Sequence, residues 1–160
     1  MLNALTTFEK LMQDHEIIQA NTRIIACSAD NLLAISCLQD ISVDITNQQV
    51  NFISDRRVNL KHAIISLRDG LIEHQNREEA VLQPLVGDPL INSIKSEHRN
   101  ILEILTDLDW ILLNVGPLGV LYNSFFIKHK IDALCQILNT NCARENSVLE
   151  LLQRLPVTQN

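Results

Sequence analysis

The chain has 160 residues, of which 46% are hydrophobic and 20% are charged. The hydrophobic share excludes an intrinsically disordered chain, and the length fits one domain that spans residues 1–160. A net charge of -6 with neutral histidines disfavours a nucleic-acid partner, because binding to phosphates requires a basic face. Only 4 glycines and 4 prolines argue against an all-β sandwich, which needs many turns.

The sequence shows no targeting or membrane signal. No stretch reaches about 18 uninterrupted apolar residues, so we expect no membrane-spanning helix. Residues 1–10 lack the basic segment and apolar run of a signal peptide. The 4 cysteines form no CxxC motif and are expected to be buried free thiols. We therefore expect a cytoplasmic protein.

Apolar residues recur at helical spacing along nearly the whole chain. The first helix is predicted to begin near Thr6, because Thr6 and Glu9 have the spacing of a capping box. Residues 28–39 either extend this helix or form a short one, and residues 40–49 form a long connection. The second helix is predicted over residues 50–85, where a segment rich in proline and glycine stops it.

The third helix is predicted to begin after Asp88, a good N-cap that is followed by Pro89 at the first helical position. It ends before Gly116, and a fourth helix covers residues 118–155. Four long helices joined by short breaks predict an all-α, antiparallel up-and-down four-helix bundle. Its one long connection joins the first two helices.

The second and fourth predicted helices carry an internal repeat at an offset of 67 residues. Residues 62–85 align with residues 129–152, and 9 of the 24 aligned pairs are identical. One identical pair is Glu78 and Glu145. Two unrelated amphipathic helices usually share fewer positions than this.

The first and third predicted helices also echo each other. Asp14-His15 in one and Glu97-His98 in the other place an acid directly before a histidine on the apolar face. Together with the repeat, this pattern predicts a bundle with approximate two-fold symmetry.

Five side chains on the apolar faces form a candidate metal site. His74 and Glu78 are four residues apart, so both lie on one face of a helix. That face is apolar, and a buried carboxylate is costly unless it is paired or bound to a cation. Glu145 holds the Glu78 position in the repeat, and His15 and His98 lie on the apolar faces of the other two helices. Nitrogen and oxygen ligands suit iron, zinc or manganese, and periodicity alone does not choose among them.

The two remaining histidines, His62 and His129, are related to each other by the repeat. His62 lies about 18 Å along the helix from His74, so neither is expected to be a ligand. The sequence contains no glycine-rich phosphate loop, no GxSxG motif and no coherent Ser/His/Asp set. We therefore expect a binding protein and not an enzyme.

Together these motifs resemble the hemerythrin-like (HHE cation-binding) family, whose members are four-helix bundles that hold a non-heme di-iron centre. The family has an acid–histidine pair on the first helix, HxxxE on the second, EH on the third and a second HxxxE on the fourth. In this chain the four motifs read Asp14-His15, His74 to Glu78, Glu97-His98 and Asn141 to Glu145. The resemblance covers nearly the whole chain. The ligands that it implies are His15, His74 and His98 as terminal imidazoles and Glu78 and Glu145 as carboxylates that bridge two irons.

The resemblance also implies a class of function. Members of the family bind O2 reversibly, sense oxygen or redox state, or handle iron under oxidative or nitrosative stress. The implied partners are the metal ion and O2 or another small diatomic molecule, with no nucleic acid and no membrane. The oligomeric state is left open.

The chain departs from the family at Asn141, where the second HxxxE motif has histidine. An amide is a much poorer ligand for iron than a neutral imidazole. Three outcomes are open: a free coordination position, a site for a single iron or zinc ion, or a site that no longer fills. In the last case the chain would be a degenerate bundle that acts as a binding or scaffold module.

Overall fold

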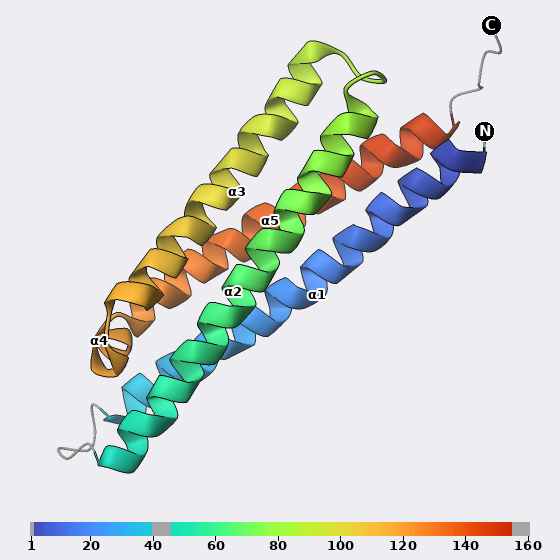
Figure 1. Ribbon diagram of the computed structural model, residues 1–160. Coiled ribbons are helices and arrows are strands. Elements are labelled where there is room, and N and C mark those ends of the chain that lie inside the picture. Colours follow the sequence, from blue (N-terminus) through green and yellow to red (C-terminus); the bar gives the residue numbers. More distant parts are fainter. Residues whose placement is uncertain (1, 40–45, 155–160) are drawn as a thin grey trace, which may run out of the picture.

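The computed structural model describes residues 2–39 and 46–154, and these residues are almost entirely helical (Figure 1). The helices are α1 (Leu2–Gln39), α2 (Asn47–Leu82), α3 (Asp88–Asn114), the short α4 (Pro117–Tyr122) and α5 (Ser124–Arg154). The all-α prediction is thus confirmed.

The four long helices form a bundle in which the chain reverses direction between consecutive long helices (Figure 1). α1 and α3 each pack against both α2 and α5, which places α1 diagonally across from α3, and α2 across from α5. α4 lies at one end of the molecule and contacts α1, α2 and α5. The helices that the repeat relates to each other therefore face each other across the middle of the bundle.

α1 is longer than the sequence predicted. It begins at Leu2, so Thr6 lies within the helix and is not its cap. Residues 2–5 contain neither glycine nor proline, and nothing in this segment stops a helix from growing through it. At the other end, residues 28–39 continue α1 and do not form a separate helix.

α2 begins at Asn47, before the predicted start, because Thr46 caps it. The Thr46 hydroxyl accepts a hydrogen bond from the Gln49 backbone N–H (3.3 Å), and the Gln49 side chain accepts one from the Thr46 N–H (2.8 Å). Of the predicted connection over residues 40–49, residues 40–45 lie outside the described residues. The remainder is the cap and first turn of α2.

Proline and glycine lie between the end of α2 and the start of α3. α2 ends at Leu82, before Pro84, which has no N–H to donate to a further helical hydrogen bond. The prediction that Asp88 caps α3 is wrong, because Asp88 is the first helical residue and Gly87, which has no side chain, is the N-cap.

The prediction of one helix over residues 118–155 is wrong, because Asn123 separates α4 from α5. Its backbone (φ -100°, ψ 7°) leaves the helical region. The Asn123 side chain donates a hydrogen bond to the Gly119 carbonyl (2.7 Å), which also accepts the Asn123 backbone N–H (3.0 Å). Residue 155, the predicted end, lies outside the described residues.

Two apolar clusters fill the interior and leave a polar layer between them. Along α1, His15 lies between Leu11 of the smaller cluster and Ile18 of the larger one. The candidate ligands of α2, α3 and α5 fall between the same two clusters along their own helices. The polar layer is thus closed by hydrocarbon on both sides, where unpaired polar groups are costly.

None of the described helices has the length and hydropathy that a membrane-spanning segment requires. All four cysteines are free. Cys142 is buried as predicted, whereas Cys27 and Cys37 are exposed because they lie on the outer face of α1.

Candidate metal centre

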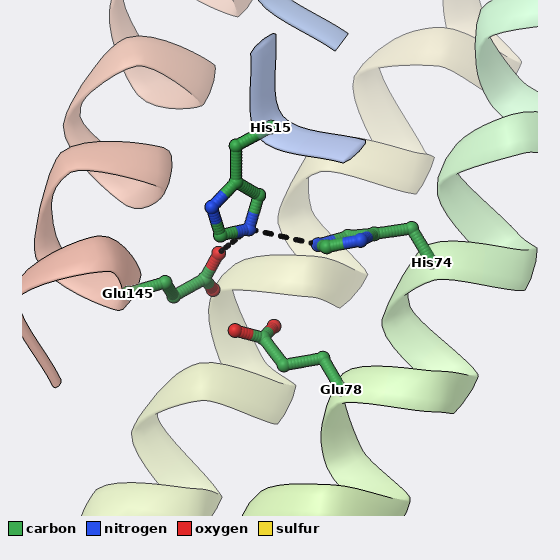
Figure 2. A group of neighbouring side chains, drawn as sticks. All are labelled: His15, His74, Glu78 and Glu145. Carbon is green, nitrogen blue, oxygen red and sulfur yellow. Dashed lines mark hydrogen bonds and ion pairs between the residues drawn. The ribbon is translucent and has the colours of Figure 1, made fainter. Parts of the chain in front are cut away.

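Four buried side chains from three helices converge in the polar layer (Figure 2). His15 comes from α1, His74 and Glu78 come from α2, and Glu145 comes from α5. Each offers one ligand atom, and the four atoms lie within 4.8 Å of one another. This group could hold a metal ion.

The two imidazole rings meet at the centre of the group. His15 Nε2 lies 2.9 Å from His74 Nε2 and 3.3 Å from Glu145 Oε2 (Figure 2). The rings stand edge to face with their centroids 4.6 Å apart. Four-residue spacing on α2 places Glu78 one turn from His74 on the same face, so both point into this space.

Partners outside the group fix the orientation of both rings. His15 Nδ1 donates to the Asn146 amide oxygen, Oδ1, at 2.6 Å. His74 Nδ1 lies 3.4 Å from Asp14 Oδ2, which also accepts a hydrogen bond from Arg77 at 2.7 Å. With its outer nitrogen held in this way, each ring directs its Nε2 toward the centre, as the histidine ligands of metal sites do.

The residues present fit a transition-metal ion. Both oxygens of Glu78 are buried and make no hydrogen bond, although Oε2 lies 3.3 Å from His98 Nε2. A metal cation beside the carboxylate would offset the remaining cost of its burial. Two ring nitrogens that face each other at 2.9 Å share a single proton or a cation. Two imidazoles and two carboxylates are a donor set that iron, zinc and manganese accept.

His98, the fifth predicted ligand, lies on the far side of the same carboxylates. Its Nε2 is 3.1 Å from Glu145 Oε1 and 3.3 Å from Glu78 Oε2. Its Nδ1 is 3.2 Å from Glu79 Oε1. His98 thus contacts three carboxylates and lies outside the four-residue group.

Asn141 is buried beside this second half of the site but turns its amide outward. Its Nδ2 donates to Glu97 Oε2 at 3.2 Å, and Glu97 also pairs with Arg144. His98 therefore has no second nitrogen ligand from α5, and the two halves of the site differ.

The pKa values of the two central histidines, His15 and His74, are shifted in opposite directions. Burial, together with the neighbouring His15, lowers the pKa of His74 to about 4. Burial also disfavours the charged form of His15, but its contacts with Glu145 and Asn146 outweigh this and raise its pKa above the ordinary value. A metal ion bound between the rings would compete with a proton for the same nitrogen lone pairs.

The carboxylates and His98 are strongly coupled. Burial opposes the charged form of His98, but Glu145, Glu78 and Glu79 outweigh it and raise its pKa to about 10. Burial would raise the pKa of Glu145, yet His15 and His98 lower it to about 2. Burial raises the pKa of Glu78. The layer therefore needs positive charge beside its carboxylates.

The other histidines and the nearby cysteine lie outside the site. His62 and His129 are exposed, in agreement with the prediction that they are not ligands. Cys142 is buried next to Asn141, and burial raises the pKa of its thiol to about 12. It therefore remains a neutral thiol that packs in the larger apolar cluster.

Sequence reasoning missed two residues that support the ligands. Glu79 contacts His98 as well as Lys95. Asn146 contacts His15. The repeat carries a signal for both, because Glu79 and Asn146 are aligned positions directly after the two glutamates of the site.

Comparisons of this chain with protein families, with curated proteins and with solved structures give no match.

Proposed function

We propose that the protein is a hemerythrin-like bundle that binds a single iron ion through His15, His74, Glu78 and Glu145. The observation that carries this proposal is the convergence of these four buried ligand groups within 4.8 Å. The order of the long helices, with one histidine or HxxxE-type motif on each, supports a hemerythrin-like up-and-down topology. The role is binding and not catalysis of a reaction on an organic substrate.

A single ion is favoured because only one half of the site has two imidazoles. His15 and His74 already face each other across 2.9 Å. On the other side, His98 is hydrogen-bonded to carboxylates at both ring nitrogens, and Asn141 is committed to Glu97.

An iron ion bound here would supply redox chemistry and an affinity for O2 or another small diatomic molecule. The chain's own residues orient the ligand atoms, because Asn146 and Asp14 hold the outer nitrogens of the two histidines. The apolar clusters above and below exclude bulk water from the layer.

The test is to load the purified protein with ferrous iron without oxygen, remove unbound metal and measure iron per chain. We expect about one iron per chain and a new absorption band when air is admitted. Repeating the measurement with manganese and zinc ranks the three metals by the number of ions bound per chain. Less than about 0.2 iron per chain together with an unchanged spectrum would contradict the proposal.

A second candidate is a metal-free bundle that serves as a binding or scaffold module. Asn141 favours it, because this residue stands where the resemblance expects a ligand histidine and donates a hydrogen bond to Glu97. The ion pairs of His98 with Glu78 and Glu145 favour it too, since they neutralise charge without a metal.

Thermal unfolding with and without a chelator separates the two candidates. A metal that binds only the folded state raises the melting temperature, so we expect chelation to lower it by about 5 °C or more. An unchanged melting temperature after the loading protocol favours the metal-free module.

A further inference from the structure

A cavity of about 140 Å³ lies between α1 and α2 and reaches a ligand of the proposed metal site. Its lining combines apolar side chains, such as Ile18 and Leu67, with the polar side chains of Asp14, Glu73 and Arg77. His74 forms part of the wall. The cavity therefore adjoins the half of the site that has two imidazoles.

Gly70 keeps this cavity open. A Cβ atom built at Gly70 meets no atom within 4 Å, so a side chain there would extend into free space in the cavity wall. Glycine inside a helix is unfavourable compared with alanine. The aligned position in α5 is Ile137, which packs against the larger apolar cluster. The aligned position in α5 thus carries a packed side chain where α2 has glycine.

The charge of the lining favours cations. Two carboxylates, Asp14 and Glu73, face one guanidinium, Arg77. A second cavity of about 320 Å³, between α2 and α3, reaches His98 and has the opposite balance, with Lys95 and Arg99 against Glu79. A positive ion is therefore drawn to the first cavity and repelled from the second.

A chain of contacts connects the first cavity with the centre of the site through the ring of His74. Asp14 Oδ2 is 3.4 Å from His74 Nδ1, and His74 Nε2 is 2.9 Å from His15 Nε2. Arg77 closes the outer side by donating to the same Asp14 oxygen, and its side chain is 41% exposed and so has room to move.

We propose that the cavity at Gly70 is the port through which a divalent metal cation reaches His74 and the centre of the site. This inference rests on the proposed function, namely that the site binds a metal ion. Asp14 and Glu73 attract the cation at the mouth, and movement of Arg77 away from Asp14 opens the path to the His74 ring.

The test follows the uptake of Co²⁺, whose visible absorption changes when it acquires nitrogen and oxygen ligands. Stopped-flow mixing gives the uptake rate, and displacement by a chelator gives the release rate. In Gly70→Leu, whose side chain fills the cavity, both rates are expected to fall about tenfold with an unchanged Kd. Glu73→Gln should slow uptake about twofold and lose its effect at high salt.

Two controls are matched to Gly70→Leu. Gly70→Ala places only a methyl group in the cavity and should retain near-normal rates. Asn76→Leu adds the same side chain to the lining of the second cavity on the same helix and should leave uptake unchanged. Circular dichroism confirms that each variant folds.

The port is overturned if Gly70→Leu takes up and releases Co²⁺ at the normal rates. It is also overturned if release accelerates while uptake is unchanged, since a blocked passage slows both directions. If the unmodified protein binds no Co²⁺, Fe²⁺ or Zn²⁺, the proposed function itself fails, which is a different result from normal rates in Gly70→Leu.

Discussion

The α1–α2 pair and the α3–α5 pair of helices have the same outer contacts around different inner residues. On the α1–α2 side, Asp14 accepts a hydrogen bond from an arginine of α2 and lies beside His74. On the α3–α5 side, Glu97 pairs with the aligned arginine of α5 and accepts a hydrogen bond from Asn141. The same kind of supporting contact thus occurs on the α3–α5 side, where Asn141 stands at the position aligned with His74. Such contacts alone therefore do not indicate a metal.

His15 and His98 differ in the charge of the residue that contacts their outer ring nitrogen. Nδ1 of His15 contacts the neutral side chain of Asn146, whereas Nδ1 of His98 contacts the carboxylate of Glu79. His98 therefore has negative partners on both ring nitrogens. On the other side, His15 and His74 direct their inner nitrogens at each other, and the need for an added cation is concentrated there.

The largest effect is expected when the complete half is made to resemble the incomplete one. His74→Asn removes one of the two imidazoles and leaves an amide that can turn toward Asp14. Because loss of a mere supporting contact to a ligand costs about 10–100-fold in metal affinity, we expect Kd to rise by more than about 100-fold. Equilibrium titration with Fe²⁺ or Co²⁺ measures this.

His62→Asn is the matched control, since it makes the same change at an exposed histidine of the same helix. It should leave the affinity as it is. If His74→Asn bound metal as well as the unmodified chain, the ligand set proposed here would be wrong.

The reciprocal change sharpens the comparison. Asn141→His places an imidazole opposite His98, with Glu97 available to accept from its outer nitrogen as Asp14 does for His74. We expect bound iron to rise from about one to about two ions per chain, because a second pair of imidazoles then shares the two carboxylates. Metal analysis after anaerobic loading measures the change.

Asn139→His provides the control for a histidine added to α5 at an exposed position. If a folded Asn141→His protein still bound one ion per chain, the two halves of the site would differ in metal binding for reasons beyond this residue.

Much of the fold could be predicted from the sequence because a helix pattern is local. Apolar residues at 3.6-residue spacing indicated the four long helices, and the spacing of His74 and Glu78 placed both on an inner face. The break at Asn123 was missed because it depends on whether the backbone of a single residue adopts helical angles or leaves them. Periodicity carries no information on that choice.

The surroundings of the site were harder to predict than its central residues. Asn146 and His15 are far apart in the sequence, and their contact requires that α1 and α5 be neighbours with a particular rotation. Glu79 lies beside the apolar stripe of its own helix, yet this edge faces α3 and His98. Rotation and neighbour choice arise from packing of the whole bundle, which no single helix encodes.

The smallest expected effect concerns Gly70 and Ile137, two aligned positions that differ in packing. In metal-free protein, Gly70→Ala should stabilise the fold by about 0.5–1 kcal/mol, because alanine favours the helix and its Cβ meets open space. Ile137→Ala should destabilise it by about 1–2 kcal/mol, since partly buried apolar contacts are lost. Urea unfolding in the presence of a chelator measures both.

Gly119→Ala tests whether open space is the reason for the gain at Gly70. A Cβ at Gly119 would lie 3.1 Å from Val115 Cβ, so the helix preference of alanine is opposed there by crowding. If Gly119→Ala stabilised the protein as much as Gly70→Ala, helix propensity alone would explain both gains. The open space at Gly70 would then make no measurable contribution to the free energy of unfolding. A gain at Gly70 alone means that this glycine lowers the stability of the fold at a position where a larger residue fits, as expected if the proposed port needs this position unfilled.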